Sequence, residues 1–256
     1  MELFKIKHKF TKEVLFEGEF ESFKDCVEMA IKLEISLSGA ILSRMDLSGM
    51  DLSWADFSES NLSRANLSGS DLSGAKLYKS TLSMSDLSGA KLYESDLYKA
   101  KLSRANLSGS DLSWSNLSWS DFSGAELSRV NFSRTDLSGA NFSGADFSEA
   151  NFSGANLSWV NFSGANLYRA KLYKSTFPRA KRNKIAINKI PIQLLGFLWH
   201  IIIFDHHMKI GCELHKISEW KAFDDKRINE MDSTALDFWK KNKQFLLSAC
   251  AANGRG

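Results

Sequence analysis

Large hydrophobic residues recur at every fifth position over more than half of the chain. From Leu37 to Phe177 each fifth residue is Leu or Phe, which gives 29 consecutive five-residue units without an insertion. Two positions before the large residue stands Ala in 14 units and Ser in 9. Asp, Asn or Lys usually precedes the large residue, and Ser follows it in 23 units. The unit therefore reads Ala-Asp/Asn-Leu-Ser-Gly.

A period of five fits neither an α-helix nor a flat strand. On a helix, steps of five residues advance by about 140° and spread the large residues around the cylinder, and on a strand they alternate between the two faces. If each unit is instead a short extended side followed by a turn, the small and the large residue both point inward. Coils of such sides stack about 4.8 Å apart and share one hydrophobic core. The pattern predicts an all-β solenoid.

The segments ANLSGSDLSGA and ANFSGADFSEANFSGAN resemble the pentapeptide repeat family. The resemblance covers residues 35–179 and implies a right-handed quadrilateral β-helix of about seven coils, with four units in each coil. One ladder of inward side chains is then Leu47, Leu67, Leu87, Leu107, Leu127, Phe147 and Leu167. The resemblance implies a fold more than a function, because solenoids with many roles share it.

Residues 1–34 are predicted to form an N-terminal cap. Residues 2–20 have the pattern of two strands joined by a turn, and a helix is expected to begin after Ser22, which forms a capping box with Asp25. The end of an open coil stack exposes unpaired backbone groups, so the hairpin and the helix are expected to lie across the first coil.

Residues 180–256 are predicted to form a separate C-terminal α+β domain of strands and two helices. A strand is expected over 208–217, one helix from about Glu219, capped by Ser218, to Met231, and a second helix over 233–249. Both flanks of the repeat are similar to those of pentapeptide repeat proteins carried by phages and prophages. The resemblance also implies homodimerisation through the last helix, because helices that end such solenoids often pair in the family.

Charge and cysteine content favour a cytoplasmic protein without naming a ligand. The chain has 33 Lys and Arg against 30 Asp and Glu, for a formal net charge of +3. Its three cysteines are odd in number and far apart, which argues against a disulfide framework. The N-terminus lacks a signal-peptide pattern, and the apolar run over 194–204 is too short to span a bilayer.

The C-terminal region contains one candidate metal site. His206, His207, Cys212 and His215 have the residue types of a zinc site, but they lack the repeated paired spacing that makes such signals specific. An ordinary buried cysteine at a strand edge is the competing interpretation. The histidines avoid the repeat and no nucleophile motif is present, so neither an enzyme nor a cofactor is predicted. A metal-binding or enzymatic C-terminal module remains an alternative.

Charges in the repeat bear on a second alternative. Family members that protect or inhibit DNA gyrase are thought to imitate duplex DNA with an acidic surface, which would make this chain a topoisomerase modulator. Residues 35–179 hold 14 basic and 14 acidic residues, which is poor mimicry. No acid occurs over 150–204, so a cationic end is predicted there, either as a solvated junction or as a docking site for an anionic partner. It comprises Arg169, Lys171, Lys174, Arg179, Lys181, Arg182 and Lys184.

Tryptophan and arginine occupy outward turn positions of the repeat. With 20 residues in each coil, turn residues 20 positions apart lie above one another, and we call such a series a corner line. Three arginines share one corner line, and four tryptophans occupy two neighbouring corner lines. These candidate partner-binding residues are Arg44, Arg64, Arg104, Trp54, Trp114, Trp119 and Trp159. Trp and Arg are enriched in protein interfaces, whereas no base-reading motif supports a nucleic-acid partner. The sequence therefore predicts a non-enzymatic, protein-binding β-helical rod. The resemblance of its flanks to phage-encoded proteins implies a phage origin and a bacterial host complex as its target.

Overall fold

The computed structural model describes residues 1–172, 175–176, 180–182, 185–187, 191–194, 197–199, 201–211 and 213–256. The chain divides into two compact units, Met1–Ile185 and Ala186–Gly256. The first unit contains both the N-terminal flank and the repeat. The finer predicted boundaries, at 34/35 and 179/180, stay predictions.

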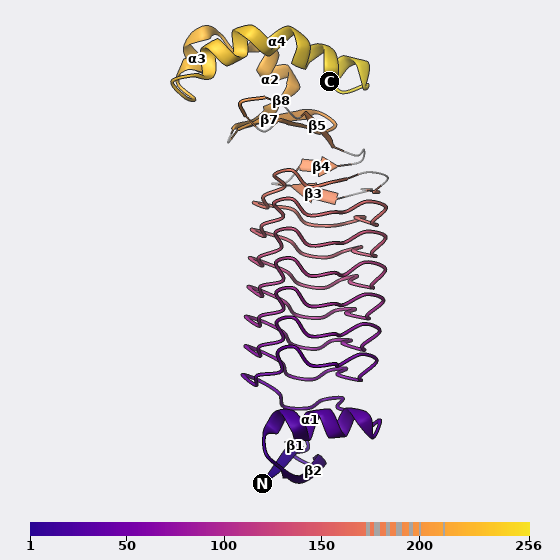
Figure 1. Cartoon of the computed structure of the whole chain (residues 1–256). Coiled ribbons are helices and arrows are strands. Elements are labelled where there is room, and N and C mark those ends of the chain that lie inside the picture. The colour runs from indigo at the N-terminus through magenta and orange to yellow at the C-terminus, as the bar shows by residue number, and fades with distance from the viewer. Residues whose placement is uncertain are drawn as a thin grey trace. The chain divides into compact units, whose positions relative to one another are not determined.

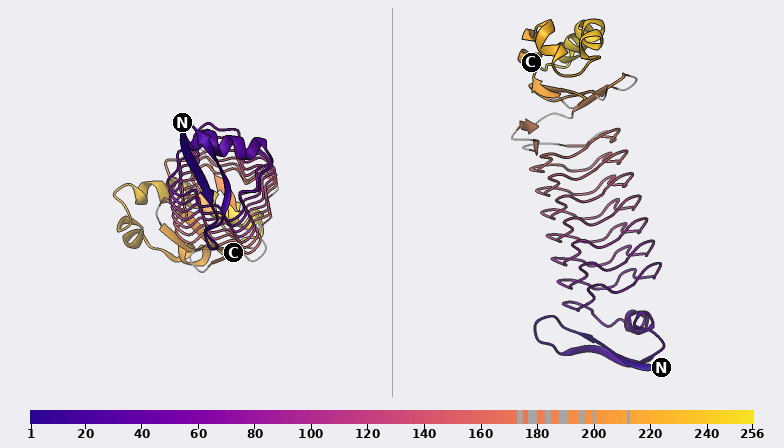
Figure 2. Two further views of the ribbon diagram at one scale, coloured as in Figure 1. Left: turned by 90° about the horizontal axis from the view of Figure 1, so that it is seen from below. Right: turned by 90° about the vertical axis from the view of Figure 1, so that its left-hand side faces the viewer.

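The five-residue units form a β-helix whose coils stack in register (Figure 1). Bridges join residues 20 positions apart in parallel, as between Asp46 and Asn66. The main-chain N–H of Leu42 donates to the carbonyl of Asn61, and the N–H of Asn61 donates to that of Ala40, both at 2.8 Å. Each coil therefore contains four units, and equivalent residues of successive coils lie above one another, as the end-on view in Figure 2 shows.

The core of the β-helix is a continuous column of Leu and Phe side chains. The large residue of each unit from Leu37 to Leu172 is at most 7% exposed. In the later coils phenylalanines stack on one another, with 5.2 Å between the ring centroids of Phe132 and Phe152. The buried side chains include the whole predicted ladder of Leu47, Leu67, Leu87, Leu107, Leu127, Phe147 and Leu167.

The polar residue before each large residue holds the turn that follows. Oδ1 of Asp51 accepts a hydrogen bond from the main-chain N–H of Ser53 at 3.1 Å, and the amide oxygen of Asn131 does the same for Ser133. Asp and Asn therefore serve the backbone equally well in this slot. Most acids of the repeat stand in it, so the fold itself accounts for their positions.

The N-terminal flank joins the first coil through main-chain hydrogen bonds. Strands β1 (Glu2–Lys7) and β2 (Val14–Phe20) form an antiparallel hairpin, and helix α1 (Phe23–Lys32) follows. α1 begins with the predicted capping box of Ser22 and Asp25. The N–H of Lys9 donates to the carbonyl of Gly39, and the N–H of Ile41 donates to that of Lys7. The hairpin thus continues the hydrogen bonding of the first coil.

The remaining strands follow the repeat. β3 (Ala180–Arg182) and β4 (Ile185–Ile187) form a two-stranded sheet. A four-stranded antiparallel sheet has the order β5 (Ile192–Leu194), β6 (Ile201–Ile203), β7 (His207–Ile210) and β8 (Glu213–Lys216). The strand expected over 208–217 is thus a hairpin in the structure, with Gly211 at a positive φ of 57° in its turn.

The expectation of two C-terminal helices is wrong, because the described residues form three. The helix predicted over 219–231 is divided into α2 (Ile217–Ala222) and α3 (Asp225–Asn229), and α4 spans Ala235–Ala252. α2 begins after Lys216, so Ser218 is inside the helix and not its cap. At the division, the Asp224 side chain caps α3 by accepting from the N–H of Arg227. The three helices pack on the sheet through a hydrophobic core that includes Trp220 and Trp239.

Candidate protein-binding surface

Every unit of the β-helix ends in a turn whose second residue has a positive φ. From residue 39 to residue 169 this corner position is Gly in 11 units and another residue in 16. A left-handed backbone costs a non-glycine residue about 1–2 kcal/mol, and Asn and Asp tolerate it best among the others. Neither Asn nor Asp occupies any of these corners.

Arg, Trp and Lys dominate the corners that lack glycine. Six of the sixteen are Arg, four are Trp and two are Lys. The full set is Arg44, Trp54, Glu59, Arg64, Lys79, Met84, Glu94, Lys99, Arg104, Trp114, Trp119, Arg129, Arg134, Glu149, Trp159 and Arg169. These large side chains stand where the backbone favours glycine, so the backbone conformation alone does not explain them.

The four predicted tryptophans lie at these corners and are exposed. Trp54 is 72% exposed, Trp119 is 59% exposed, and Trp114 and Trp159 are each 52% exposed. With 20 residues in a coil, Trp54 and Trp114 share one corner line, and Trp119 and Trp159 share the next. Both lines border the same side of the β-helix, the one whose units are centred on Leu37, Phe57, Leu77, Leu97, Leu117, Leu137 and Leu157. We call it the aromatic side.

The indole rings of two of these tryptophans lie against glycine in the next coil. A Cβ atom on Gly74 would be 2.5 Å from the ring of Trp54, and one on Gly139 would be 2.7 Å from that of Trp119. At Trp114 the neighbour in the next coil is Arg134, whose guanidinium lies over the indole ring, 4.7 Å from the ring centroid. The glycines of the next coil thus give two indoles a flat support, while more than half of each ring-bearing side chain stays exposed.

Sequence reasoning missed two tyrosines on the aromatic side. Tyr78 and Tyr98 stack with 5.7 Å between ring centroids, and the ammonium groups of Lys79 and Lys99 lie over them at 4.8 and 4.9 Å. Both tyrosines lie between the two tryptophan lines. Assigning each residue of the sequence to its position within the 20-residue coil would have placed both tyrosines between the two tryptophan lines.

The predicted arginines lie on a different edge of the β-helix. Arg44, Arg64 and Arg104 are exposed and share one corner line with Met84. This line is one side further around the coil than the line of Trp119 and Trp159. The structure therefore brings the tryptophans together on one side and places the arginines along the far edge of the adjoining side.

The predicted cationic end lies only partly within the described residues. Arg169 is exposed, with its guanidinium 3.7 Å from a carboxylate oxygen of Glu149 and 5.1 Å from the ring centroid of Tyr168. Lys171 is exposed beside it. Lys174, Arg179, Lys184 and the side chains of Lys181 and Arg182 lie outside the described residues.

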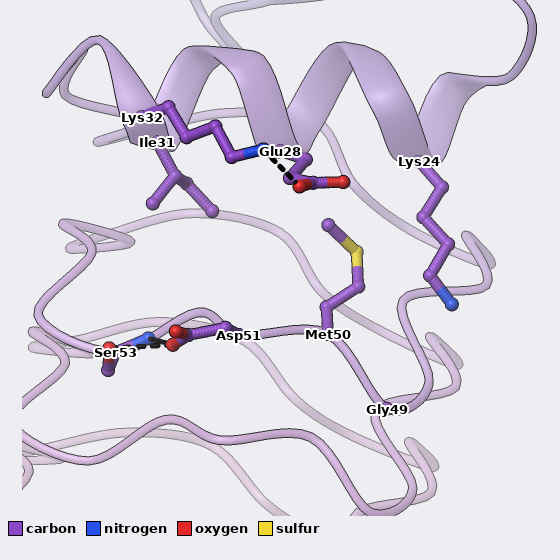
Figure 3. Close-up of a pocket in the computed structure, with 8 residues that line it drawn as sticks. All are labelled: Lys24, Glu28, Ile31, Lys32, Gly49, Met50, Asp51 and Ser53. Atoms are coloured by element: carbon purple, nitrogen blue, oxygen red, sulfur yellow. Dashed lines mark hydrogen bonds and ion pairs between the residues drawn. The ribbon is translucent and has the colours of Figure 1, made fainter.

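A cavity of about 400 Å³ lies between α1 and the adjacent coils (Figure 3). Its polar groups are already engaged with one another or with the backbone. Lys32 pairs with Glu28, Lys24 Nζ donates to the carbonyl of Ser48, and Oδ1 of Asp51 accepts from Ser53. Each of these polar side chains therefore already has a hydrogen-bond or ion-pair partner within the fold.

The C-terminal histidines do not converge on one point. His207 is opposite Lys216 across the β7–β8 pair, and His215 is opposite Met208, so the two rings point to opposite faces of the sheet. Nε2 of His215 donates a 2.6 Å hydrogen bond to the carboxylate of Glu213, and His206 Nδ1 lies 2.5 Å from the carbonyl oxygen of Gly256. Among the described residues, which omit Cys212, no group of three or more His, Cys, Asp and Glu could hold a metal ion.

Comparison with known proteins assigns the repeat to a family. The sequence model described as pentapeptide repeats matches eight overlapping copies over residues 34–179, more than half of the chain. The chain belongs to the pentapeptide repeat family. The right-handed β-helix of the family agrees with the stacked coils described above. The match does not include the flanks, so their resemblance to phage-encoded proteins stays a prediction.

Solved structures of the same family are similar to the repeat. HetL from the cyanobacterium Nostoc sp. strain PCC 7120, involved in heterocyst differentiation regulation, is 32% identical, with 60% of this chain and 87% of HetL covered and a TM-score of 0.29. QnrB1, a plasmid-mediated fluoroquinolone resistance protein, is 21% identical, with 56% and 86% covered and a TM-score of 0.43. A pentapeptide repeat protein of the Arabidopsis thaliana thylakoid lumen is 33% identical, with 44% and 68% covered and a TM-score of 0.22.

Family membership rests on the repeat itself, because all three TM-scores are below 0.5. No curated protein matches the chain. Within the described residues, no helix has the length and apolar character that crossing a membrane requires.

Proposed function

We propose that this chain is a non-enzymatic protein-binding scaffold that presents Trp and Tyr side chains along the aromatic side of a rigid β-helix. One observation carries the proposal: large aromatic and cationic residues occupy left-handed corners where glycine would be more favourable. A residue that raises the free energy of the folded backbone in this way is retained when its side chain has a role other than folding. Contact with a partner is such a role, because Trp, Tyr and Arg are enriched among the few residues that dominate binding at protein interfaces.

The arrangement of the rings supports a protein partner. Main-chain hydrogen bonds between coils hold these turns, as from the N–H of Trp119 to the carbonyl of Ser138 and from the N–H of Lys99 to that of Ser118, so little backbone entropy would be lost on binding. Trp54 and Trp119 are further supported from beneath by Gly74 and Gly139. A preorganised row of exposed rings suits a surface that docks apolar side chains of another protein.

The test is affinity capture from a bacterial lysate with matched variants. Trp54→Gly, Trp119→Gly and Trp159→Gly together remove three rings without straining the backbone. Met84→Gly, Arg129→Gly and Glu149→Gly change three left-handed corners that do not border the aromatic side, and they keep the net charge. We expect a protein that wild type and the control variant retain and the triple-Trp variant loses at least tenfold. Equal recovery by all three proteins, or none by wild type, contradicts the proposal.

Imitation of duplex DNA towards a topoisomerase has less support. One side, which we call the acidic side, has four carboxylates interspersed with three amides in the slot before the large residue: Asp46, Asn66, Asp86, Asn106, Glu126, Asp146 and Asn166. One of its edges is the line of Arg44, Arg64 and Arg104. A DNA mimic needs an uninterrupted negative surface, whereas here positive charge stands directly beside the acids.

The remaining parts of the proposal concern the flanks and the setting. β1, β2 and α1 act as a cap that prevents end-to-end pairing of coil stacks. α4 mediates self-association, for which the half-exposed Phe245 provides apolar surface.

The protein is located in the cytoplasm, in keeping with buried, unpaired Cys26 and Cys250. It is encoded by a phage or prophage. A metal-binding or enzymatic C-terminal module has no support from the described histidines.

A further inference from the structure

The side of the β-helix that adjoins the aromatic side is unusually rich in positive charge. Its units are centred on Leu42, Leu62, Leu82, Leu102 and Phe122, and we call it the cationic side. One edge is the corner line of Arg44, Arg64, Met84 and Arg104, and the other is the line of Glu59, Lys79, Lys99 and Trp119. With Lys101 between the edges, the cationic side has six cations and two acids, Glu59 and Asp121.

The surface between these two edges is mainly polar, and its larger side chains are Ile41 in the first coil and Lys101. Ser43, Ser63, Ser83 and Ser103 follow one another along it, and the Ser103 hydroxyl donates to that of Ser83 at 3.1 Å. The bridge residues beside them include the uncharged Asn61 and Thr81. The cations on the two edges thus lie on either side of a surface that consists mainly of hydroxyl and amide groups.

The six cations make no ion pair with any residue in the described part of the chain. Elsewhere on the repeat, Lys91 pairs with Asp71 at 3.3 Å and Arg129 pairs with Glu149 at 3.3 Å. Oδ1 of Asp121 on the cationic side already accepts from the N–H of Ser123 and from Asn141. The ammonium groups of Lys79 and Lys99 lie over the rings of Tyr78 and Tyr98 at the shared edge, and no carboxylate among the described residues neutralises any of the six cations.

The dimensions of the cationic side suit a narrow, extended anion. Arg44 and Arg104 are three coils apart, which is about 14 Å at the strand spacing of about 4.8 Å. An extended polypeptide of about five residues covers that length, at about 3.3 Å per residue. A nucleic-acid duplex, about 20 Å wide, would extend over the arginine edge and meet the acids of the neighbouring side, Asp46 and Asp86 among them.

We infer that the cationic side binds an extended acidic segment of a protein partner through Arg44, Arg64, Arg104, Lys79, Lys99 and Lys101. The inference rests on the proposed function and adds the chemistry of the partner. The line of Lys79, Lys99 and Trp119 is shared with the aromatic side, so one partner can contact the exposed rings and place its acidic segment on the adjoining side.

A fluorescein-labelled decaglutamate peptide tests the inference directly, with binding to the full chain followed by fluorescence anisotropy at low ionic strength. Arg44→Gly, Arg64→Gly and Arg104→Gly together remove three charges from the cationic side. Arg129→Gly, Arg134→Gly and Arg169→Gly remove three arginines from equivalent left-handed corners elsewhere. Both variants have the same net charge, and glycine suits the backbone at all six positions.

We expect wild type to bind the peptide, the first variant to bind at least tenfold more weakly, and the second to change affinity less than twofold. Added salt should weaken wild-type binding, because exposed charges are screened. Equal weakening by both variants, absence of wild-type binding, or tighter binding of a ten-residue oligothymidylate would each overturn the inference. None of these results depends on the tryptophans, so the lysate capture still judges the proposed function separately.

Discussion

The interior of the β-helix and its corners are built from the same repeat but follow different rules. Inside, every large position from Leu37 to Leu172 is Leu or Phe and is buried. At the corners the backbone favours one residue type, glycine, yet 16 of 27 positions between residues 39 and 169 have another. The interior is therefore determined by packing, whereas the backbone conformation alone does not determine which residues occupy the corners.

The largest effect is expected inside the β-helix. Leu107→Ala should lower the free energy of unfolding by about 2–5 kcal/mol, because it leaves a cavity in the middle of the core ladder. Ser108→Ala is the matched control, since its half-buried hydroxyl only accepts a 3.2 Å hydrogen bond from Ser128, and it should change stability by less than about 0.5 kcal/mol. Urea unfolding measures both. A larger loss for Ser108→Ala would mean that the inward assignment is wrong.

A smaller effect is expected at the small inward positions. The Ser80 hydroxyl is buried and lacks a hydrogen-bond partner among the described residues, whereas the Ser85 hydroxyl donates to the carbonyl of Leu82 at 2.6 Å. An unsatisfied buried hydroxyl is costly, so Ser80→Ala should raise the free energy of unfolding by about 1 kcal/mol. Ser85→Ala should leave it unchanged or lower it. Equal responses of the two variants would show that the hydroxyl contacts do not matter here.

Much of this comparison could be predicted from the sequence. The five-residue period separates inward from outward positions, because only a coil of short sides can bury every fifth residue. The resemblance to a known family then supplies the 20-residue coil, which assigns each corner residue to a line. Tyr78 and Tyr98 could have been placed between the tryptophan lines by the same arithmetic.

Other features depend on contacts that no local pattern encodes. The indole of Trp54 lies on Gly74, which is determined by side-chain rotation and by the neighbouring coil. In the second unit, apolar periodicity predicts one helix where the structure has α2 and α3. There the Asp224 side chain caps α3, and Phe223 packs its ring 5.0 Å from that of His215. The extended backbone at Phe223 is a tertiary requirement that outweighs the helical pattern.

The central claim is that large corner side chains are present despite the fold and not because of it. The free energy of unfolding of the variant Trp54→Gly, Trp119→Gly and Trp159→Gly tests this most directly. We predict a value equal to or above that of wild type, because glycine relieves about 1–2 kcal/mol of backbone cost at each corner and offsets the lost ring contacts. A loss of more than about 2 kcal/mol would show that the rings support the coils, and would contradict the account.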